Sequence, residues 1–146
     1  MQYALANTEH DAIIHLGDHI GDAKKLSQEH PDTSFYMVMG NCDYQKEGEN
    51  ELFITLEDKN ILITHGHLYD VKNGFTRLVE RSRILRADLV LYGHTHKASL
   101  RYEYDCRFMC PGQIQRNDII GKASYGIVTI ENGQIGCELM DIPESI

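Results

Sequence analysis

Residues 89–96 constrain the fold more than any other stretch of this sequence. An apolar run, 89–92, stops at Gly93, and two histidines follow as His94 and His96. The run is typical of a buried β-strand. Because side chains two apart in an extended segment point the same way, we expect both imidazoles to face one point beyond the end of the strand.

Three further stretches share this design: an apolar run, a small residue, and then a side chain able to bind a metal ion. They are residues 11–16, 34–39 and 60–63, which lead to Asp18, Asn41 and His65 respectively. Open α/β sheets bind their ligands beyond the carboxyl ends of the strands, so these side chains are expected to meet there. A packed core has no need of this pattern.

The donors in this set are carboxylate, carboxamide and imidazole, without thiolate. Such ligands suit borderline divalent ions. We therefore predict a metal site formed by Asp18, Asn41, His65, His94 and His96. Taken singly, each residue has an ordinary explanation as a turn residue or strand end. Together, at equivalent strand ends, they are better explained by a common site.

Strands and helices alternate in the first two thirds of the chain, and an antiparallel region follows. Helices are expected at residues 22–29 and 75–85, because apolar residues recur there at helical spacing. Later strands are expected at 99–105, 107–109, 124–131 and 134–140, the last two joined by a hairpin turn at Asn132-Gly133. We expect residues 1–146 to form a single α/β domain.

Composition excludes some functions. The formal net charge of −8 argues against binding to long nucleic acid or to an anionic membrane surface. No apolar run approaches the roughly 20 residues of a membrane-spanning helix, and residues 1–4 do not resemble the start of a signal peptide. The four cysteines form no Cys-x-x-Cys pair and are expected to be reduced thiols. We expect a cytoplasmic protein.

Four motifs, in this order along the chain, carry a resemblance to a known family. They are Gly17-Asp18, Gly40-Asn41-Cys42-Asp43, Thr64-His65-Gly66-His67 and Gly93-His94-Thr95-His96. They resemble the calcineurin-like metallophosphoesterases, and among these the small bacterial and archaeal single-domain phosphodiesterases. The resemblance implies two packed mixed β-sheets flanked by helices and a dinuclear metal site, often holding Mn²⁺; Ni, Fe, Zn and Co are the alternatives.

The resemblance also assigns roles. Asp18 would bridge two ions; Asn41, His65 and His94 would complete one site, and His96 would belong to the other. His67, Cys42 and Asp43 would lie around the ions, near the phosphate. Cys42 stands where many members carry a histidine, which leaves the general acid unassigned.

One departure from the family is expected to weaken the second metal site. The family opens with a strand ending in Asp-x-His, and this sequence contains no such motif before Gly17. Relative to the family we expect the first strand to be missing, and a misplaced gene start, a truncation, genuine degeneration or a strand supplied by a partner subunit are the explanations left open. We expect one well-held divalent ion and a weak or absent second ion.

The sequence thus predicts a metal-dependent hydrolase of phosphate esters, with diesters preferred, in which a metal-bound hydroxide attacks phosphorus. The alternative is a catalytically weak or inactive scaffold on the same fold, as in the retromer subunit that resembles these enzymes. The expected partner is a small phosphate-ester substrate, and a homo-oligomer is left open because relatives often pair.

Overall fold

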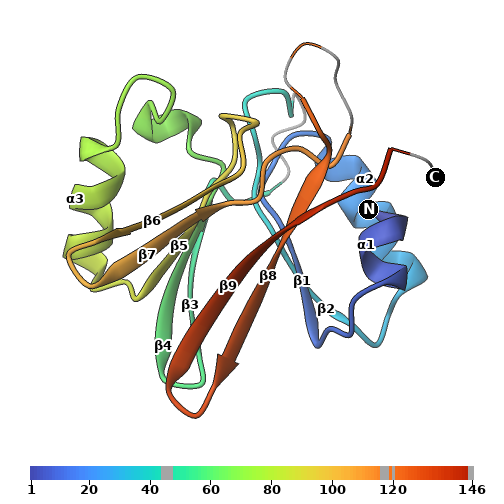
Figure 1. Ribbon diagram of the computed structural model, residues 1–146, viewed down its shortest axis with the longest axis horizontal. Helices are drawn as coiled ribbons and strands as arrows, with labels where there is room; N and C mark the ends of the chain where they lie inside the picture. Colours follow the sequence, from blue (N-terminus) through green and yellow to red (C-terminus); the bar gives the residue numbers. More distant parts are fainter. Residues whose placement is uncertain (44–47, 116–118, 120, 145–146) are drawn as a thin grey trace.

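The computed structural model shows a mixed α/β fold and describes residues 1–43, 48–115, 119 and 121–144 (Figure 1). Its elements, in chain order, are α1 (Gln2–Ala6), β1 (Ala12–His15), α2 (Ile20–Glu29), β2 (Ser34–Met37), β3 (Glu51–Leu56), β4 (Lys59–Thr64), the 3₁₀ helix η1 (His67–Tyr69), α3 (Thr76–Leu85), β5 (Leu89–Leu91), β6 (Ser99–Glu103), β7 (Cys106–Cys110), β8 (Ser124–Glu131) and β9 (Gln134–Asp141).

A five-stranded mixed sheet, in the order β3-β4-β5-β7-β6, forms the centre of the molecule. Strands β4, β5 and β7 run parallel to one another, and β3 and β6 pair antiparallel at the two edges. Helix α3 covers one face, where Leu78 and Val79 pack against Leu62, Val90 and Phe108. Because both faces are covered, β5 is buried along its whole length.

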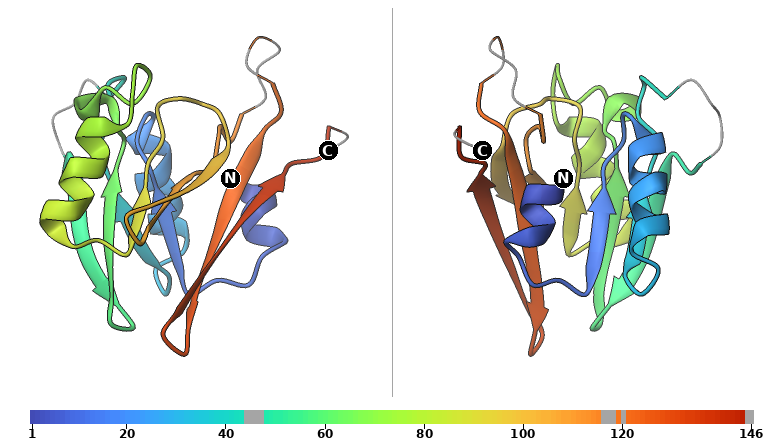
Figure 2. Two further views of the ribbon diagram at one scale, coloured as in Figure 1. Left: turned by 60° about the vertical axis from the view of Figure 1, so that its left-hand side comes forward. Right: turned by 90° about the vertical axis from the view of Figure 1, so that its right-hand side faces the viewer.

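The other face of this sheet packs against two separate two-stranded units, parallel β1–β2 and antiparallel β8–β9 (Figure 2). Between the layers lies a second core built on Val38, Ile61, Ile63, Leu89, Leu91 and Met109. The predicted fold class is therefore confirmed. Within the described residues, however, the second layer consists of two pieces rather than one continuous mixed sheet.

Most expected elements are present, with ends shifted by one or two residues. Helix α2 begins at Ile20, two residues before its predicted start, and η1 was not predicted. The helix expected at residues 75–85 is present as α3, and Leu78, Val79 and Ser82 form its buried face. Spacing alone locates such a face, because the apolar stripe must meet the sheet.

The structure also bears on two expectations drawn from composition. All four cysteines are free thiols. In the part of the chain that the structure describes, no helix has the length and apolar character needed to cross a bilayer.

Candidate functional site

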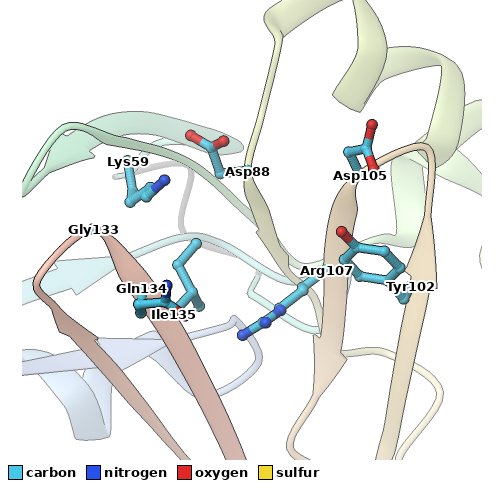
Figure 3. Close-up of a pocket in the computed structure, with 8 residues that line it drawn as sticks. All are labelled: Lys59, Asp88, Tyr102, Asp105, Arg107, Gly133, Gln134 and Ile135. Atoms are coloured by element: carbon cyan, nitrogen blue, oxygen red, sulfur yellow. The ribbon is translucent and has the colours of Figure 1, made fainter.

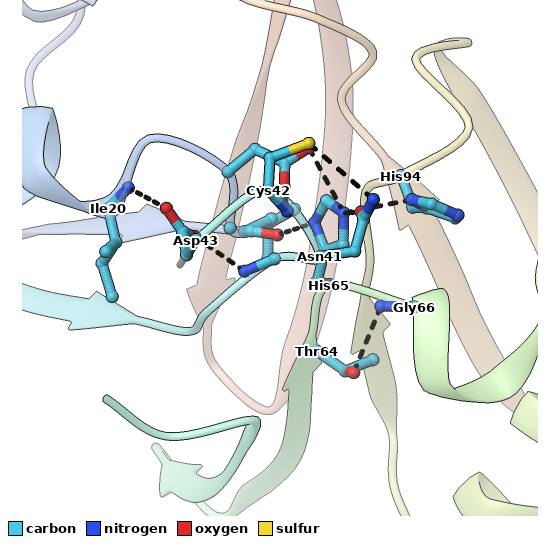
Figure 4. A network of polar contacts seen from close by, with 12 residues as sticks. Ile20, Asn41, Cys42, Asp43, Thr64, His65, Gly66 and His94 are labelled. Atoms are coloured by element: carbon cyan, nitrogen blue, oxygen red, sulfur yellow. Dashed lines mark hydrogen bonds and ion pairs between the residues drawn. The ribbon is translucent and has the colours of Figure 1, made fainter. Parts of the chain in front are cut away.

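Four of the five predicted metal ligands, Asp18, Asn41, His65 and His94, lie in one cluster beyond the carboxyl ends of four strands. Figure 4 shows Asn41, His65 and His94 in this cluster. His65 follows β4 and His94 follows β5, and the N–H of Gly93 donates to the carbonyl oxygen of His65 at 3.0 Å. Asp18 and Asn41 follow β1 and β2, which are parallel neighbours. The five-stranded sheet thus supplies the two imidazoles, and the β1–β2 unit supplies the two oxygen donors.

His65 is at the centre of the cluster and is buried, with an exposed fraction of 2%. Its Nδ1 lies 2.6 Å from the carbonyl oxygen of Leu16, to which it must donate. In the neutral ring, donation by Nδ1 leaves the lone pair on Nε2. That atom lies 3.1 Å from Asn41 Oδ1, 3.5 Å from Asp18 Oδ2 and 3.2 Å from His94 Nδ1.

The electrostatic environment keeps both imidazoles neutral near pH 7. Burial lowers the pKa of His65, although the Leu16 carbonyl and the Asp18 carboxylate act in the opposite sense. Burial, the Lys72 ammonium and the neighbouring imidazoles lower the pKa of His94 to about 4. Three atoms surround His65 Nε2, and a single proton shared with one of them can form only one hydrogen bond there, so the other two contacts lack a donor. The cluster is therefore rich in lone pairs and suited to a cation.

Two glycines allow the loops to approach this closely. A Cβ on Gly40 would lie 2.1 Å from Asp18 Oδ1, and a Cβ on Gly17 would lie 2.7 Å from both Gly40 N and His65 Nδ1. Gly17 also has φ +97°, a conformation that side chains disfavour. Both positions therefore require glycine for packing reasons, in addition to marking the strand ends.

Asp43 ties the two loops that carry the oxygen donors. Its Oδ1 accepts from the N–H of Ile20 at 2.9 Å, and its Oδ2 accepts from the N–H of Gly40 at 2.8 Å. Burial alone would raise the pKa of Asp43, but donation from these backbone groups outweighs it and the net pKa is lowered. Asp43 is thus an ionised brace behind the cluster.

Cys42 lies at the exposed rim beside Asp18. Its backbone N–H donates to Asp18 Oδ1 at 3.0 Å, and Asn41 Nδ2 lies 3.7 Å from its Sγ. Desolvation and the Asp18 carboxylate raise the pKa of Cys42, so it carries a proton near neutral pH.

His67, the first residue of η1, lines the other side of the cluster. Its ring centroid lies 5.2 Å from that of His65 and 6.1 Å from that of His94. Its Nδ1 is a buried atom for which the described residues provide no hydrogen-bond partner. Such an atom is costly to bury alone, so it marks a position where a polar ligand would fit.

His96 is the predicted ligand that the structure does not bring to the others. His94 and His96 both have left-handed backbone conformations, with φ 66° and 58°. The segment is therefore a turn and not the extended stretch expected, so the two rings need not point the same way. Among the described residues, His96 makes no hydrogen bond or ring contact with the cluster, and no group of three or more His, Cys, Asp and Glu side chains is arranged as a ready metal site.

Two features of the cluster could not be found by motif. The Leu16 carbonyl orients His65, but any residue could supply a carbonyl oxygen, so the sequence holds no signal for it. Lys72 acts on His94 through charge across the turn that follows η1, a turn visible only in three dimensions.

A cavity of about 160 Å³ lies at the opposite end of the strands (Figure 3). Lys59, Asp88 and Arg107 line it where β4, β5 and β7 begin, and the β8–β9 turn closes it. None of the predicted site residues lines it. The cluster at the carboxyl ends of the strands therefore remains the candidate site.

The chain combines helices outside two β layers with a cluster of Asp, Asn and His residues at the strand ends. Residues 2–133 match the calcineurin-like phosphoesterase superfamily domain, and the chain belongs to this family. It is 32% identical to the probable metallophosphoesterase YsnB of Bacillus subtilis strain 168, over 94% of this chain and 86% of that protein.

Several solved structures share the fold of this chain. A predicted phosphoesterase from Streptococcus pneumoniae TIGR4 superposes with a TM-score of 0.80 and 25% identity, over 99% of this chain and 84% of that one. Vps29 of Entamoeba histolytica complexed with Zn²⁺ shares the fold with a TM-score of 0.63 and 18% identity, over 96% and 87% of the two chains. A novel archaeal phosphodiesterase also shares the fold, with a TM-score of 0.64 and 20% identity, over 95% of this chain and 88% of that one.

Proposed function

We propose that this phosphoesterase-family chain hydrolyses small phosphate diesters with the help of one divalent ion held by Asp18, Asn41, His65 and His94. The observation that carries the proposal is the convergence of three donor atoms on His65 Nε2, at 3.1–3.5 Å. The archaeal phosphodiesterase of the same fold supports diesters as the substrate class.

The donor set fits a divalent ion. With metal–ligand bonds of about 2.1 Å, neighbouring donors in tetrahedral or octahedral geometry lie roughly 3.0–3.4 Å apart. The three separations around His65 Nε2 fall close to that range. Oxygen and imidazole donors suit Mn²⁺, our first choice, and also Ni, Fe, Zn and Co ions. When bound, the ion would supply positive charge for water activation and for the phosphoryl oxygens.

Backbone and side-chain groups of the chain itself perform the remaining tasks. The Leu16 carbonyl holds the His65 ring in the tautomer that presents Nε2 to the site. Asp43 keeps the Asp18 and Asn41 loops at a fixed separation. His67, with its buried unpaired Nδ1, would orient a phosphoryl oxygen, and the protonated thiol of Cys42 lies at the rim where a leaving group would depart. His96 would bind a second ion weakly.

Hydrolysis of bis(p-nitrophenyl) phosphate with added Mn²⁺ tests the proposal. We expect turnover that ethylenediaminetetraacetate abolishes, and kcat/KM lowered about 100-fold or more in Asp18→Ala and His94→Ala, the upper end of losses seen when metal sites are disturbed. The exposed His30→Ala variant is the matched control. Absence of turnover with every divalent ion, in protein shown to bind that ion, would contradict the proposal.

The second candidate is a catalytically inactive scaffold. It is favoured by the position of His96 outside the cluster and by the Vps29 fold, which the chain shares. The same assay separates the two, because a scaffold would bind the ion and leave the diester intact.

A further inference from the structure

The 3₁₀ helix η1 is too short to fix its own orientation. It spans only His67–Tyr69, between two residues with left-handed backbone conformations, Gly66 with φ 101° and Asp70 with φ 54°. Its backbone bonds are those of a single turn: the N–H of Tyr69 donates to the carbonyl oxygen of Gly66 at 3.0 Å, and that of Asp70 to His67 at 3.2 Å. Hydrogen bonds in 3₁₀ segments have poor geometry, so contacts outside η1 must set the direction of the His67 ring.

A polar network reaches η1 from two neighbouring elements. The hydroxyl of Tyr69 donates to Oε2 of Glu51, and Nη2 of Arg81 donates to the other oxygen, Oε1. Glu51 is the first residue of β3, and Arg81 lies in α3. One half-buried carboxylate thus joins η1 both to the five-stranded sheet and to the helix that covers it.

The protonation states of the three groups favour this network. Burial and the hydrogen bond to the Glu51 carboxylate raise the pKa of Tyr69, so its hydroxyl keeps its proton and remains the donor. The pKa of Arg81 is also raised, chiefly by its hydrogen bond to Glu51. Hydrogen bonds to an ionised carboxylate are stronger than those between neutral groups. The network is therefore suited to hold a turn that its own bonds hold poorly.

The network lies directly beside the candidate site. Glu51 pairs with Thr64 across β3 and β4, and His65 follows Thr64 in the chain. With three residues per turn, side chains two apart in η1 point in directions about 120° apart. Fixing the side chain of Tyr69 therefore also fixes the side of the turn from which His67 extends. The ring of His67 reaches to 5.2 Å from that of His65, measured between centroids.

We propose that Glu51, Tyr69 and Arg81 are positioning residues that hold the His67 ring against the candidate site. Among the described residues, Nδ1 of His67 has no hydrogen-bond partner, so no bond to that atom holds the ring in place. The three residues would act through η1 alone and would not touch the substrate. The inference rests on the proposed function, in which His67 orients a phosphoryl oxygen.

A double-mutant cycle on hydrolysis of bis(p-nitrophenyl) phosphate with Mn²⁺ tests the proposal. Tyr69→Phe keeps the ring and removes only the hydroxyl, and we expect it to lower kcat/KM about tenfold. In the His67→Ala background the same change should lower kcat/KM less than about twofold, because the residue through which Tyr69 acts is gone. Mn²⁺ affinity should be unchanged. The matched control is Tyr102→Phe, on an exposed tyrosine of β6. Equal losses in both backgrounds would overturn the proposal.

An NMR measurement on the metal-free chain gives a second readout, which does not depend on catalysis. The nuclear Overhauser effect between ring protons of His65 and His67 reports the contact between the two rings. It should weaken in Tyr69→Phe and in Glu51→Ala and stay unchanged in Tyr102→Phe. An unchanged effect in the first two variants would overturn the proposal. Because no substrate is present, this result decides how the ring is held even if the wild type leaves the diester intact, an outcome that would defeat the catalytic proposal alone.

Discussion

The ring of His65 is fastened to the backbone of Leu16, with Nδ1 2.6 Å from the carbonyl oxygen. His65 follows β4 of the central sheet, and Leu16 follows β1 of the other layer. A hydrogen bond across two layers thus sets the direction in which Nε2 points. Loss of a group that orients a metal ligand in this way typically costs about 10–100-fold in metal affinity.

Metal stoichiometry is the first prediction. Calorimetric titration with Mn²⁺ should show one tight equivalent and at most a weak second one, because four donors lie together and His96 lies apart. His65→Ala should abolish the tight equivalent, and His96→Ala should retain it. Two tight equivalents of equal affinity would contradict this prediction.

Gly40 should tolerate no side chain. In Gly40→Ala the new Cβ would meet Asp18 Oδ1 at 2.1 Å, so one of the two loops must move. We expect Mn²⁺ affinity to fall about tenfold or more, as when orienting groups are lost. Gly21→Ala is the matched control, since its Cβ meets nothing within 4 Å and it lies in helix α2. Equal affinity in both variants would show that the loops adapt.

Asp43→Asn tests the brace between the loops. The amide keeps the size of the side chain but can accept only with one oxygen, so one of the bonds from Ile20 and Gly40 is lost. We expect weaker Mn²⁺ binding together with destabilisation of about 1–3 kcal/mol, measured by urea unfolding. Asp58→Asn, in the exposed β3–β4 turn, should match the wild type in both measurements.

The metal-free protein should lose stability in mildly acidic solution. The pKa of His94 is lowered to about 4 in the folded chain, against an ordinary value of 6.5. The unfolded chain therefore binds the proton first, and stability present above pH 6.5 is lost as the pH falls toward 4. Urea midpoints in the presence of a chelator should follow this course, and the His94→Gln variant should show a shallower fall. An equal slope in both proteins would assign the effect to other groups.

Periodicity and turn residues predicted most of the fold. Apolar runs located β1, β2, β4 and β5. Burial alone does not explain all four runs, because β5 is buried along its whole length whereas β1 and β2 are at most half-buried. The division of the second layer into the pairs β1–β2 and β8–β9 was not predictable from such runs. Pairing between strands that are distant in the sequence depends on which strands the fold places next to each other. Helix η1 is too short to leave a periodic signal.

The candidate site was predictable in part. The topology of parallel strands brings residues that follow β1, β2, β4 and β5 to one edge, and four of the predicted ligands meet there. The direction of His96 depends on two left-handed residues in a turn, and alternation along a strand gives no guide to such a turn. The hydrogen bonds by which Asp43 holds the two loops together were not predictable, because any residue can supply a backbone N–H group and the sequence does not show which of these groups lie near the carboxylate.

The cluster draws its donors from two layers that differ in how well they are held. His65 and His94 are anchored in a sheet with a covered core on each face, whereas Asp18 and Asn41 extend from a pair of half-buried strands. An ion bound by all four of these residues would link the well-buried five-stranded sheet to the less buried β1–β2 pair. Binding of the ion would then reduce the motions of the β1–β2 pair. Removal of the ion by a chelator would allow this pair to move relative to the five-stranded sheet.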